Sequence, residues 1–199
     1  MFVRSRQILK YAYGRVEQAH GFDPVRAKMV ALGEHERVVV ELIWMSARQG
    51  IPKRVCGLVS RIGNGGLYLV LFSILLLLIE DSMKVIICSS LAILIAHLIY
   101  PWVKHAFSRD RPFHIWKHLV SDFLPLDRHS FPSGHSMTLT AAALPLMVVY
   151  PATVPVFLVA WSVMAWARIA CAHHYPSDVA AGTVLGLGAG ALSIAIILA

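Results

Sequence analysis

The sequence predicts an all-α integral membrane protein, a bundle of about five transmembrane helices preceded by an N-terminal amphipathic helix. Hydrophobic residues make up 57% of the 199 residues, more than a soluble domain of this length needs to fill one core. Only 15% of the residues are charged, and Lys and Arg outnumber Asp and Glu by 18 to 11. The positive excess must lie in the parts that stay in water, where it suits an anionic substrate or lipid surface.

The basic composition does not indicate a nucleic-acid-binding protein, because the sequence shows no soluble basic domain and no reader motif. The cysteines Cys56, Cys88 and Cys171 lack the spacing of a zinc site or a disulfide framework, so we expect them to pack as small apolar side chains. No metal and no cofactor is predicted, since no cysteine pair frames a site around the ten histidines. The first ten residues are charged without an apolar run behind them, so internal segments should drive membrane insertion.

Residues 1–60 form a basic N-terminal region, and none of it is apolar enough to span a bilayer. Between Val25 and Ser46 the apolar residues, among them Leu32 and Val39, recur at helical spacing, with charged residues mostly elsewhere on the wheel. This pattern predicts an amphipathic helix, either packed on the membrane domain or lying among lipid headgroups. We assign residues 1–60 to an interfacial region and residues 61–199 to a transmembrane domain.

Five apolar stretches follow, and each is close to the about 20 residues that a bilayer core requires. They lie near residues 62–79, 84–103, 134–150, 153–172 and 179–199. The first is the least regular, because the Gly-Asn-Gly-Gly run at 63–66 leaves only its second half strongly apolar. If this stretch re-enters the membrane instead of crossing it, the N-terminus and the later long links fall on opposite sides.

The links between these stretches are of two kinds. Residues 80–83 and the turn at Pro151 are short, so the helices they join should be antiparallel neighbours. Residues 104–131 and 168–176 are longer and, with five spans, lie on the side of the N-terminus. Because the N-terminal region and the link at 104–131 are rich in Lys and Arg, the positive-inside rule predicts that they are cytoplasmic.

The long links and the helix ends beside them collect residues suited to binding and attacking a phosphate group. They are Lys104, Arg111, Arg168, His135, His174 and Asp178. One lysine and two arginines supply charge-assisted hydrogen bonds to phosphoryl oxygens. Ser133 and Gly134 start a helix, where backbone N–H groups favour an anion. Histidine ordinarily titrates near neutral pH, so it can serve as nucleophile or as general acid.

These residues fall into three blocks of fixed spacing. Lys104 to Pro112 forms K-x6-R-P, residues 132–135 are P-S-G-H, and Arg168 to Asp178 forms R-x5-H-x3-D. In order and in placement at helix ends, the blocks resemble those of the type 2 phosphatidic acid phosphatase superfamily. The resemblance spans roughly residues 60–199. One departure is Ala167, where the family usually has a serine, and it removes one hydrogen bond to phosphate.

The resemblance implies a catalytic set and a phosphate-binding set. His174 would attack phosphorus, Asp178 would hold its other ring nitrogen, and His135 would protonate the leaving oxygen and then activate water. His173 is the one rival nucleophile, but it lacks the spacing to the aspartate. The phosphate would be held by Lys104, Arg111, Arg168, Ser133 and Gly134. Their charge would take the place that a magnesium ion occupies in other phosphoryl-transfer sites.

The resemblance also implies the function. We expect a metal-independent lipid phosphatase, a hydrolase that acts through a phosphohistidine on a lipid phosphate or diphosphate. Phosphatidylglycerophosphate, phosphatidic acid and a polyprenyl-linked phosphate remain the candidates, and we expect a bacterial inner membrane with the site on its cytoplasmic side. The alternatives are a lipid phosphotransferase, an undecaprenyl diphosphate phosphatase with a periplasmic site, and a lipid-binding scaffold without activity.

The remaining features have structural interpretations. Arg109, Lys117 and Arg128 are expected to be membrane-edge anchors whose charged ends reach water. Small residues crowd the last apolar stretch at 180–182 and 186–190, where they should allow close packing within the bundle, with a homodimer as the alternative. The expected partners are therefore a lipid phosphate substrate and the bilayer, without nucleic acid.

Overall fold

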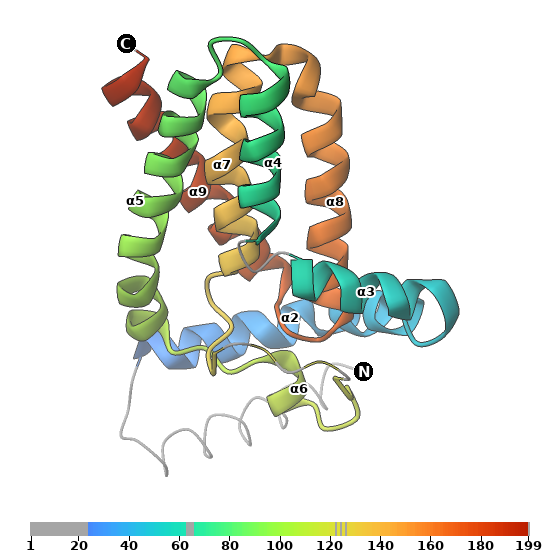
Figure 1. Ribbon diagram of the computed structural model, residues 1–199. Coiled ribbons are helices and arrows are strands. Elements are labelled where there is room, and N and C mark those ends of the chain that lie inside the picture. Colours follow the sequence, from blue (N-terminus) through green and yellow to red (C-terminus); the bar gives the residue numbers. More distant parts are fainter. Residues whose placement is uncertain (1–23, 63–65, 122, 124, 126, 199) are drawn as a thin grey trace.

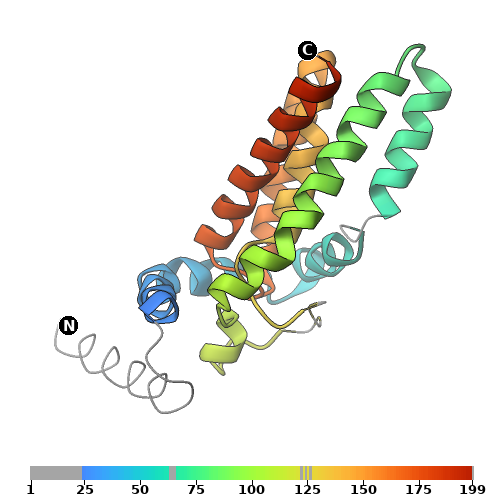
Figure 2. The same cartoon turned by 90° about the vertical axis from the view of Figure 1, so that its left-hand side faces the viewer.

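The computed structural model describes residues 24–62, 66–121, 123, 125 and 127–198, and these residues form helices and connecting loops only. The elements are α2 (Pro24–Ser46), α3 (Gly50–Ile62), α4 (Gly66–Leu78), α5 (Met83–Phe107), α6 (Pro112–Ile115), α7 (Gly134–Val149), η1 (Pro151–Thr153), α8 (Val154–Ala170) and α9 (Pro176–Ile197). Figures 1 and 2 show α4, α5, α7, α8 and α9 side by side as a bundle, with α2, α3 and α6 at one end of it. The predicted fold class is confirmed.

Three helical stretches are long and apolar enough to cross a membrane, namely Met83–Ile115, Pro151–Ala170 and Pro176–Ile197. The other two helices of the bundle, α4 and α7, are shorter. A helix rises about 1.5 Å per residue, so the 13 residues of α4 cover about 20 Å of a hydrocarbon core that is about 30 Å thick. The first predicted stretch, 62–79, is thus the least complete, because Ile62 ends α3 and α4 begins only at Gly66.

The outside of the bundle is apolar, as contact with lipid tails requires. Leu77 on α4, Trp102 on α5, Val156 on α8 and Val184 on α9 each expose more than two thirds of their surface. Soluble proteins do not leave so many large apolar side chains in water. Together with the helices of spanning length, this surface identifies an integral membrane protein.

The small residues of α9 bring it close to α7. A Cβ atom at Gly182 would clash with the Ser133 carbonyl, and one at Gly186 would clash with Thr140 and with the Met137 carbonyl. Glycine at these positions therefore allows the two backbones to meet, which is the packing within the bundle that the sequence predicted. This contact positions the site, because Ser133 begins α7 and Asp178 lies in the first turn of α9.

The N-terminal helix α2 lies across the end of the bundle, beside α8 (Figure 1). It is the predicted helix, and only part of its predicted apolar stripe meets the core, since Ile43 packs against the buried cluster that contains Tyr175. The predicted apolar positions Leu32 and Val39 stay more than a third exposed, whereas Gly33 and Val40 are buried. Small side chains on this face let α2 approach Tyr175, so α2 packs on the membrane domain and still keeps an apolar stripe outside.

The cysteines behave as predicted. Cys56, Cys88 and Cys171 are all buried and free. Cys56 and Cys171 pack in one apolar cluster with Ala167.

Candidate active site

The site lies at the end of the bundle where α5, α7, α8 and α9 meet the two long links. Ser108 ends α5 in a left-handed conformation, with φ of 40°, and its N–H donates to the Lys104 carbonyl. The chain then runs extended through Arg111, which caps α6 ahead of Pro112. This turn brings Arg109 and Arg111 beneath the bundle, toward the start of α9.

The third sequence block forms the loop between α8 and α9. The N–H groups of His173 and His174 both donate to the Arg168 carbonyl at 3.2 Å, which closes the end of α8. Tyr175 caps α9, and its N–H donates to Asp178 Oδ2 at 2.9 Å. This capping arrangement holds the carboxylate of Asp178 directly below His174, so a local helix-start motif builds part of the site.

His174 and Asp178 form a buried pair. His174 Nδ1 lies 3.5 Å from Asp178 Oδ2, and their side chains are 2% and 0% exposed. On the other side of the ring, Arg111 Nη1 lies 3.4 Å from His174 Nε2. Arginine only donates, so Nε2 is the acceptor and the ring proton lies on Nδ1, facing the carboxylate. At 3.5 Å, His174 Nδ1 and Asp178 Oδ2 are close but not hydrogen-bonded, and catalytic contacts of this kind often tighten only when substrate binds.

Electrostatics keep His174 neutral. Burial, followed by the charges of Arg111 and Arg168, lowers the pKa of His174 well below its ordinary value of 6.5. The imidazole therefore keeps a lone pair on Nε2 at neutral pH. A neutral, buried imidazole with its second nitrogen against a carboxylate is the arrangement that nucleophilic catalysis by histidine needs.

The neighbouring His173 points elsewhere. Its Nε2 lies 2.8 Å from the Phe123 carbonyl and 2.9 Å from Ser121 Oγ, both in the long link. Burial and the Arg168 charge lower the pKa of His173 to about 3. The His173 ring thus connects the long link to the loop between α8 and α9, and its Nε2 is engaged in this structural contact.

Lys104 and Arg111 converge on one anionic group, the carboxylate of Asp127. Lys104 Nζ donates to Oδ2 at 2.9 Å, Arg111 Nη2 donates to Oδ1 at 2.6 Å, and the Tyr100 hydroxyl donates to Oδ2 at 2.8 Å. Asp127 was not predicted from the sequence as a site residue. The one feature that sets it apart is that it is an acidic residue within a basic link. The Asp127 carboxylate accepts hydrogen bonds from Lys104 and Arg111, which were predicted to hold phosphate, so these two side chains form a site that binds an anionic group.

The second block starts α7 beside these cations. The ring of Tyr100, which contacts Lys104, would lie 3.1 Å from a Cβ at Gly134. Gly134 therefore lets the start of α7 come close to the anion-binding group. Ser133 is fully buried and caps α7, where its Oγ accepts from the Ser136 hydroxyl at 2.9 Å and its N–H donates to the Asp178 carbonyl. Its hydroxyl is thus engaged in the helix start.

His135 and Arg168 complete the set. His135 is the second residue of α7, at the end of the helix that Ser133 caps. Arg168 is buried near the end of α8, and its charge acts on both His173 and His174. All the site residues predicted from the sequence therefore belong to the same end of the bundle.

Arg109 corrects a prediction. We expected a membrane-edge anchor, but its side chain is 2% exposed and its Nη1 donates to Asp178 Oδ1 at 2.6 Å. The sequence signal was its position two residues before Arg111, too weak to separate it from Lys117 and Arg128, which are exposed.

Two histidines of the long link have a spacing found in metal sites. His114 and His118 are four residues apart, a spacing that suits a metal pair on a helix, but α6 ends at Ile115 and His118 bonds to Glu41 at 2.9 Å. Within the described residues, no three side chains of His, Cys, Asp or Glu gather as a metal site.

Comparison with known proteins gives partial sequence matches to two bacterial phosphatases. The chain is 39% identical over 98 residues to the decaprenylphosphoryl-5-phosphoribose phosphatase of Mycobacterium tuberculosis (strain ATCC 25618 / H37Rv), covering 49% of this chain and 53% of that protein. It is 34% identical over 88 residues to the lipid A 1-phosphatase of Rhizobium etli, covering 42% and 38%. The chain thus spans about half, or less, of the length of these curated relatives.

Two solved structures share the fold over most of the chain. LpxE of Aquifex aeolicus superposes with a TM-score of 0.66 at 22% identity, covering 79% of this chain and 93% of that one. The PAP2-type phosphatidylglycerolphosphate phosphatase of Bacillus subtilis gives a TM-score of 0.60 at 21% identity, covering 83% and 86%. Finally, the family model described as the PAP2 superfamily matches residues 84–199, which contain all three blocks. Because this match covers more than half of the chain, the chain belongs to the PAP2 superfamily.

Proposed function

We propose that the protein is a metal-independent membrane lipid phosphatase that removes a phosphate from a lipid phosphate or diphosphate through a phosphohistidine at His174. The observation that carries the proposal is the pairing of two features at one spot. Lys104 and Arg111 converge on an anionic group, and Arg111 also contacts Nε2 of the neutral His174. A phosphate that replaces the Asp127 carboxylate on these cations would lie next to the nucleophile.

In the first step, Nε2 of His174 would form a bond to phosphorus while the bond between phosphorus and the leaving oxygen breaks. His135 would give its proton to that oxygen. The imidazole becomes positively charged, and Asp178, which faces Nδ1, would stabilise it. In the second step, a water would lose a proton to His135 and attack phosphorus, which releases inorganic phosphate and restores His174.

Three cations would provide the charge that the transition state needs. Lys104 and Arg111 already bind an anionic group, and Arg168 lies near enough to lower the pKa of His174. Fixed cations in a buried site stabilise charge on the phosphoryl oxygens as a metal ion would. We therefore expect activity to persist in EDTA and to be inhibited by vanadate. Loss of activity on chelation, with recovery on adding magnesium or zinc, would contradict this part of the proposal.

The substrate class follows from the place of the site and from the relatives. Lys104 and Arg168 lie in the last turns of α5 and α8, where a headgroup phosphate could reach them while the acyl or prenyl chains stay in the membrane. The names of the related proteins all describe phosphates on lipids. Phosphatidylglycerophosphate, phosphatidic acid and polyprenyl-linked phosphates are therefore the substrates to test first.

The decisive experiment measures inorganic phosphate released from these lipids by the purified full chain in detergent. The His174→Ala and His135→Ala variants should abolish release, while the exposed His118→Ala serves as a matched control with full activity. Turnover by His174→Ala close to that of the wild type would remove the proposed nucleophile. If phosphate is lost from the lipid but appears on an added alcohol and not in solution, the protein is a phosphotransferase.

We also propose that the site and the N-terminal region face the cytoplasm of a bacterial inner membrane. Figure 1 supports a common side for both, because α2 and α3 lie at the same end of the bundle as α6. The positive-inside rule then favours the cytoplasm. The test is a cysteine at the exposed Lys117, introduced without the native cysteines and challenged with an impermeant maleimide on intact cells. Labelling without permeabilisation would refute the cytoplasmic assignment and favour a periplasmic undecaprenyl diphosphate phosphatase.

A further inference from the structure

Asp178, which faces the proposed nucleophile, has a second partner, Arg109, at one of the unspecified positions of the first sequence block. Arg109 Nη1 donates to Asp178 Oδ1 at 2.6 Å, and both side chains are almost fully buried. The other carboxylate oxygen, Oδ2, faces His174 Nδ1 and accepts from the Tyr175 N–H. Arg109 therefore binds one oxygen of Asp178, while the other oxygen faces the histidine and accepts from the Tyr175 N–H, and these contacts together restrict rotation of the carboxylate.

Arg109 is itself held by the N-terminal helix. Its Nη2 donates to Glu36 Oε2 at 2.8 Å, and Glu36 also accepts from the Ser177 hydroxyl at 2.8 Å and from the Ser177 N–H at 2.6 Å. Glu36 thus satisfies an N–H group at the start of α9, where the helix dipole favours a negative charge. The result is a row of alternating charges, from Glu36 through Arg109 to Asp178, and Asp178 in turn faces the neutral His174.

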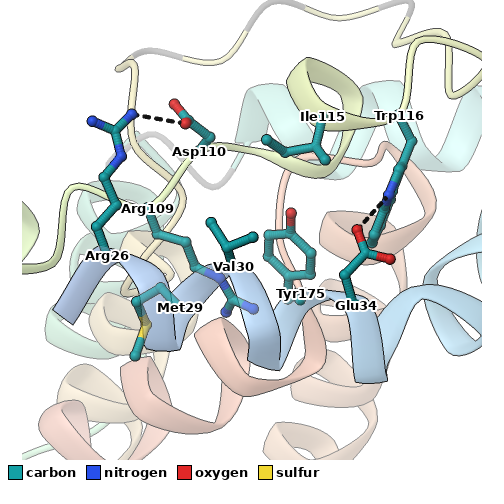
Figure 3. A pocket seen from close by; sticks show the side chains of 10 residues that line it. Arg26, Met29, Val30, Glu34, Arg109, Asp110, Ile115, Trp116 and Tyr175 are labelled. Atoms are coloured by element: carbon teal, nitrogen blue, oxygen red, sulfur yellow. Dashed lines mark hydrogen bonds and ion pairs between the residues drawn. The ribbon is translucent and has the colours of Figure 1, made fainter. Parts of the chain in front are cut away.

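The surrounding packing holds this row in place. Figure 3 shows residues of α2 facing Arg109 and Tyr175 across a small pocket. The Arg109 guanidinium lies 3.7 Å from the centre of the Tyr175 ring, and a Cβ at Gly33 of α2 would lie 3.1 Å from that ring. Tyr175 directly follows His174 in the sequence, so α2 packs against the loop that carries the proposed nucleophile.

We propose that Glu36 and Arg109 are positioning residues for the phosphatase reaction, so that α2 completes the active site from outside the segment that matches the family. The inference rests on the proposed function of His174 and Asp178. A buried charge is tolerated when it is paired, and removing one member of the row leaves its neighbour unpaired. Asp178 would then shift, and His174 would lose the orientation needed for attack on phosphorus.

The test compares Glu36→Gln and Arg109→Gln with Arg26→Gln. Arg26 bonds to Asp110 at 3.0 Å and so connects the same helix to the same link through an ion pair that does not include Glu36, Arg109 or Asp178. In steady-state assays with phosphatidic acid in detergent, the first two variants should lower kcat, by up to about 100-fold for Arg109→Gln, with KM nearly unchanged, because misplacement of reacting groups slows the chemical step. Arg26→Gln should keep the wild-type kcat.

A second measurement separates positioning from general stability. In an Asp178→Asn background, Glu36→Gln should lower kcat no further, since the row acts through Asp178 and residues of one network are not additive. An additive loss, or full kcat in Glu36→Gln alongside an active wild type, would overturn the positioning role and leave the phosphatase proposal intact. A wild-type protein that releases no phosphate from any lipid phosphate would instead overturn the proposed function, and the positioning role with it.

Discussion

Replacing Asp127 with asparagine should make the site bind phosphate and vanadate more tightly. Asp127 accepts hydrogen bonds from Lys104 and Arg111, the residues proposed to hold the substrate phosphate. Burial opposes ionisation of Asp127, but the hydrogen bond from Lys104 and the charges of Lys104 and Arg111 outweigh it and lower the pKa of the carboxyl below its ordinary value. At neutral pH the protein's own carboxylate therefore competes with the substrate for the same cations.

The expected gain in phosphate affinity depends on how exposed to water the ion pairs of Asp127 are. Lys104 and Arg111 are buried, but the Asp127 side chain is 36% exposed, so each ion pair is screened in part by water. We assign about 1 kcal/mol to each pair, the upper end for exposed ion pairs. Asparagine keeps the shape and one oxygen but removes the charge, so phosphate binding should improve by about 1–2 kcal/mol, or about 5- to 30-fold.

The assay is the inhibition constant of vanadate for the purified full chain, measured with a lipid phosphate in detergent. Asp110→Asn is the matched control, because Asp110 lies in the same link but pairs with Arg26 away from the cations. It should leave the inhibition constant unchanged. Weaker inhibition of Asp127→Asn would refute the reasoning, because it would mean that the carboxylate holds Lys104 and Arg111 in position for phosphate.

Three further predictions concern stability and proton transfer. Gly186→Ala should destabilise the protein by about 1–3 kcal/mol through its clash with α7, seen as a lower unfolding temperature, whereas Gly188→Ala, whose Cβ would meet nothing, should not. The pKa of His173 is about 3 in the folded protein, against about 6.5 in the unfolded protein. The unfolded state therefore binds more protons below pH 6.5, and the free energy of unfolding should decrease as the pH is lowered, by about 2 kcal/mol at pH 5. A flat unfolding profile from pH 7 to pH 5 would contradict this. If His135 is the general acid, His135→Ala should lose less activity on a phosphate ester with an acidic leaving group than on a lipid phosphate, and equal losses on both would exclude that role.

Much of the fold could be predicted because a membrane helix is recognisable from the hydrophobicity of its own residues. Apolar stretches, their breaks and the short turns at 80–83 and Pro151 depend on neighbouring residues, so the helices of the bundle appear in the predicted order. The face that α2 buries could not be predicted in this way. Hydrophobic spacing did not separate Leu32 and Val39, which stay exposed, from Ile43, which packs against the core. The buried face also includes Gly33, because a Cβ there would lie 3.1 Å from the Tyr175 ring.

The same division holds for the site. The spacing of the three blocks determined the family and the candidate catalytic and phosphate-binding residues, since each block is a short motif at a helix end. Only the tertiary structure decided what these residues touch: Asp127 on Lys104 and Arg111, and Arg109 between Glu36 and Asp178. The partners of Arg109, Glu36 and Asp178, are 73 and 69 residues away from it in the sequence, so no local sequence pattern could predict these ion pairs. They form because charges buried at the end of the bundle must find partners wherever the packing brings them together.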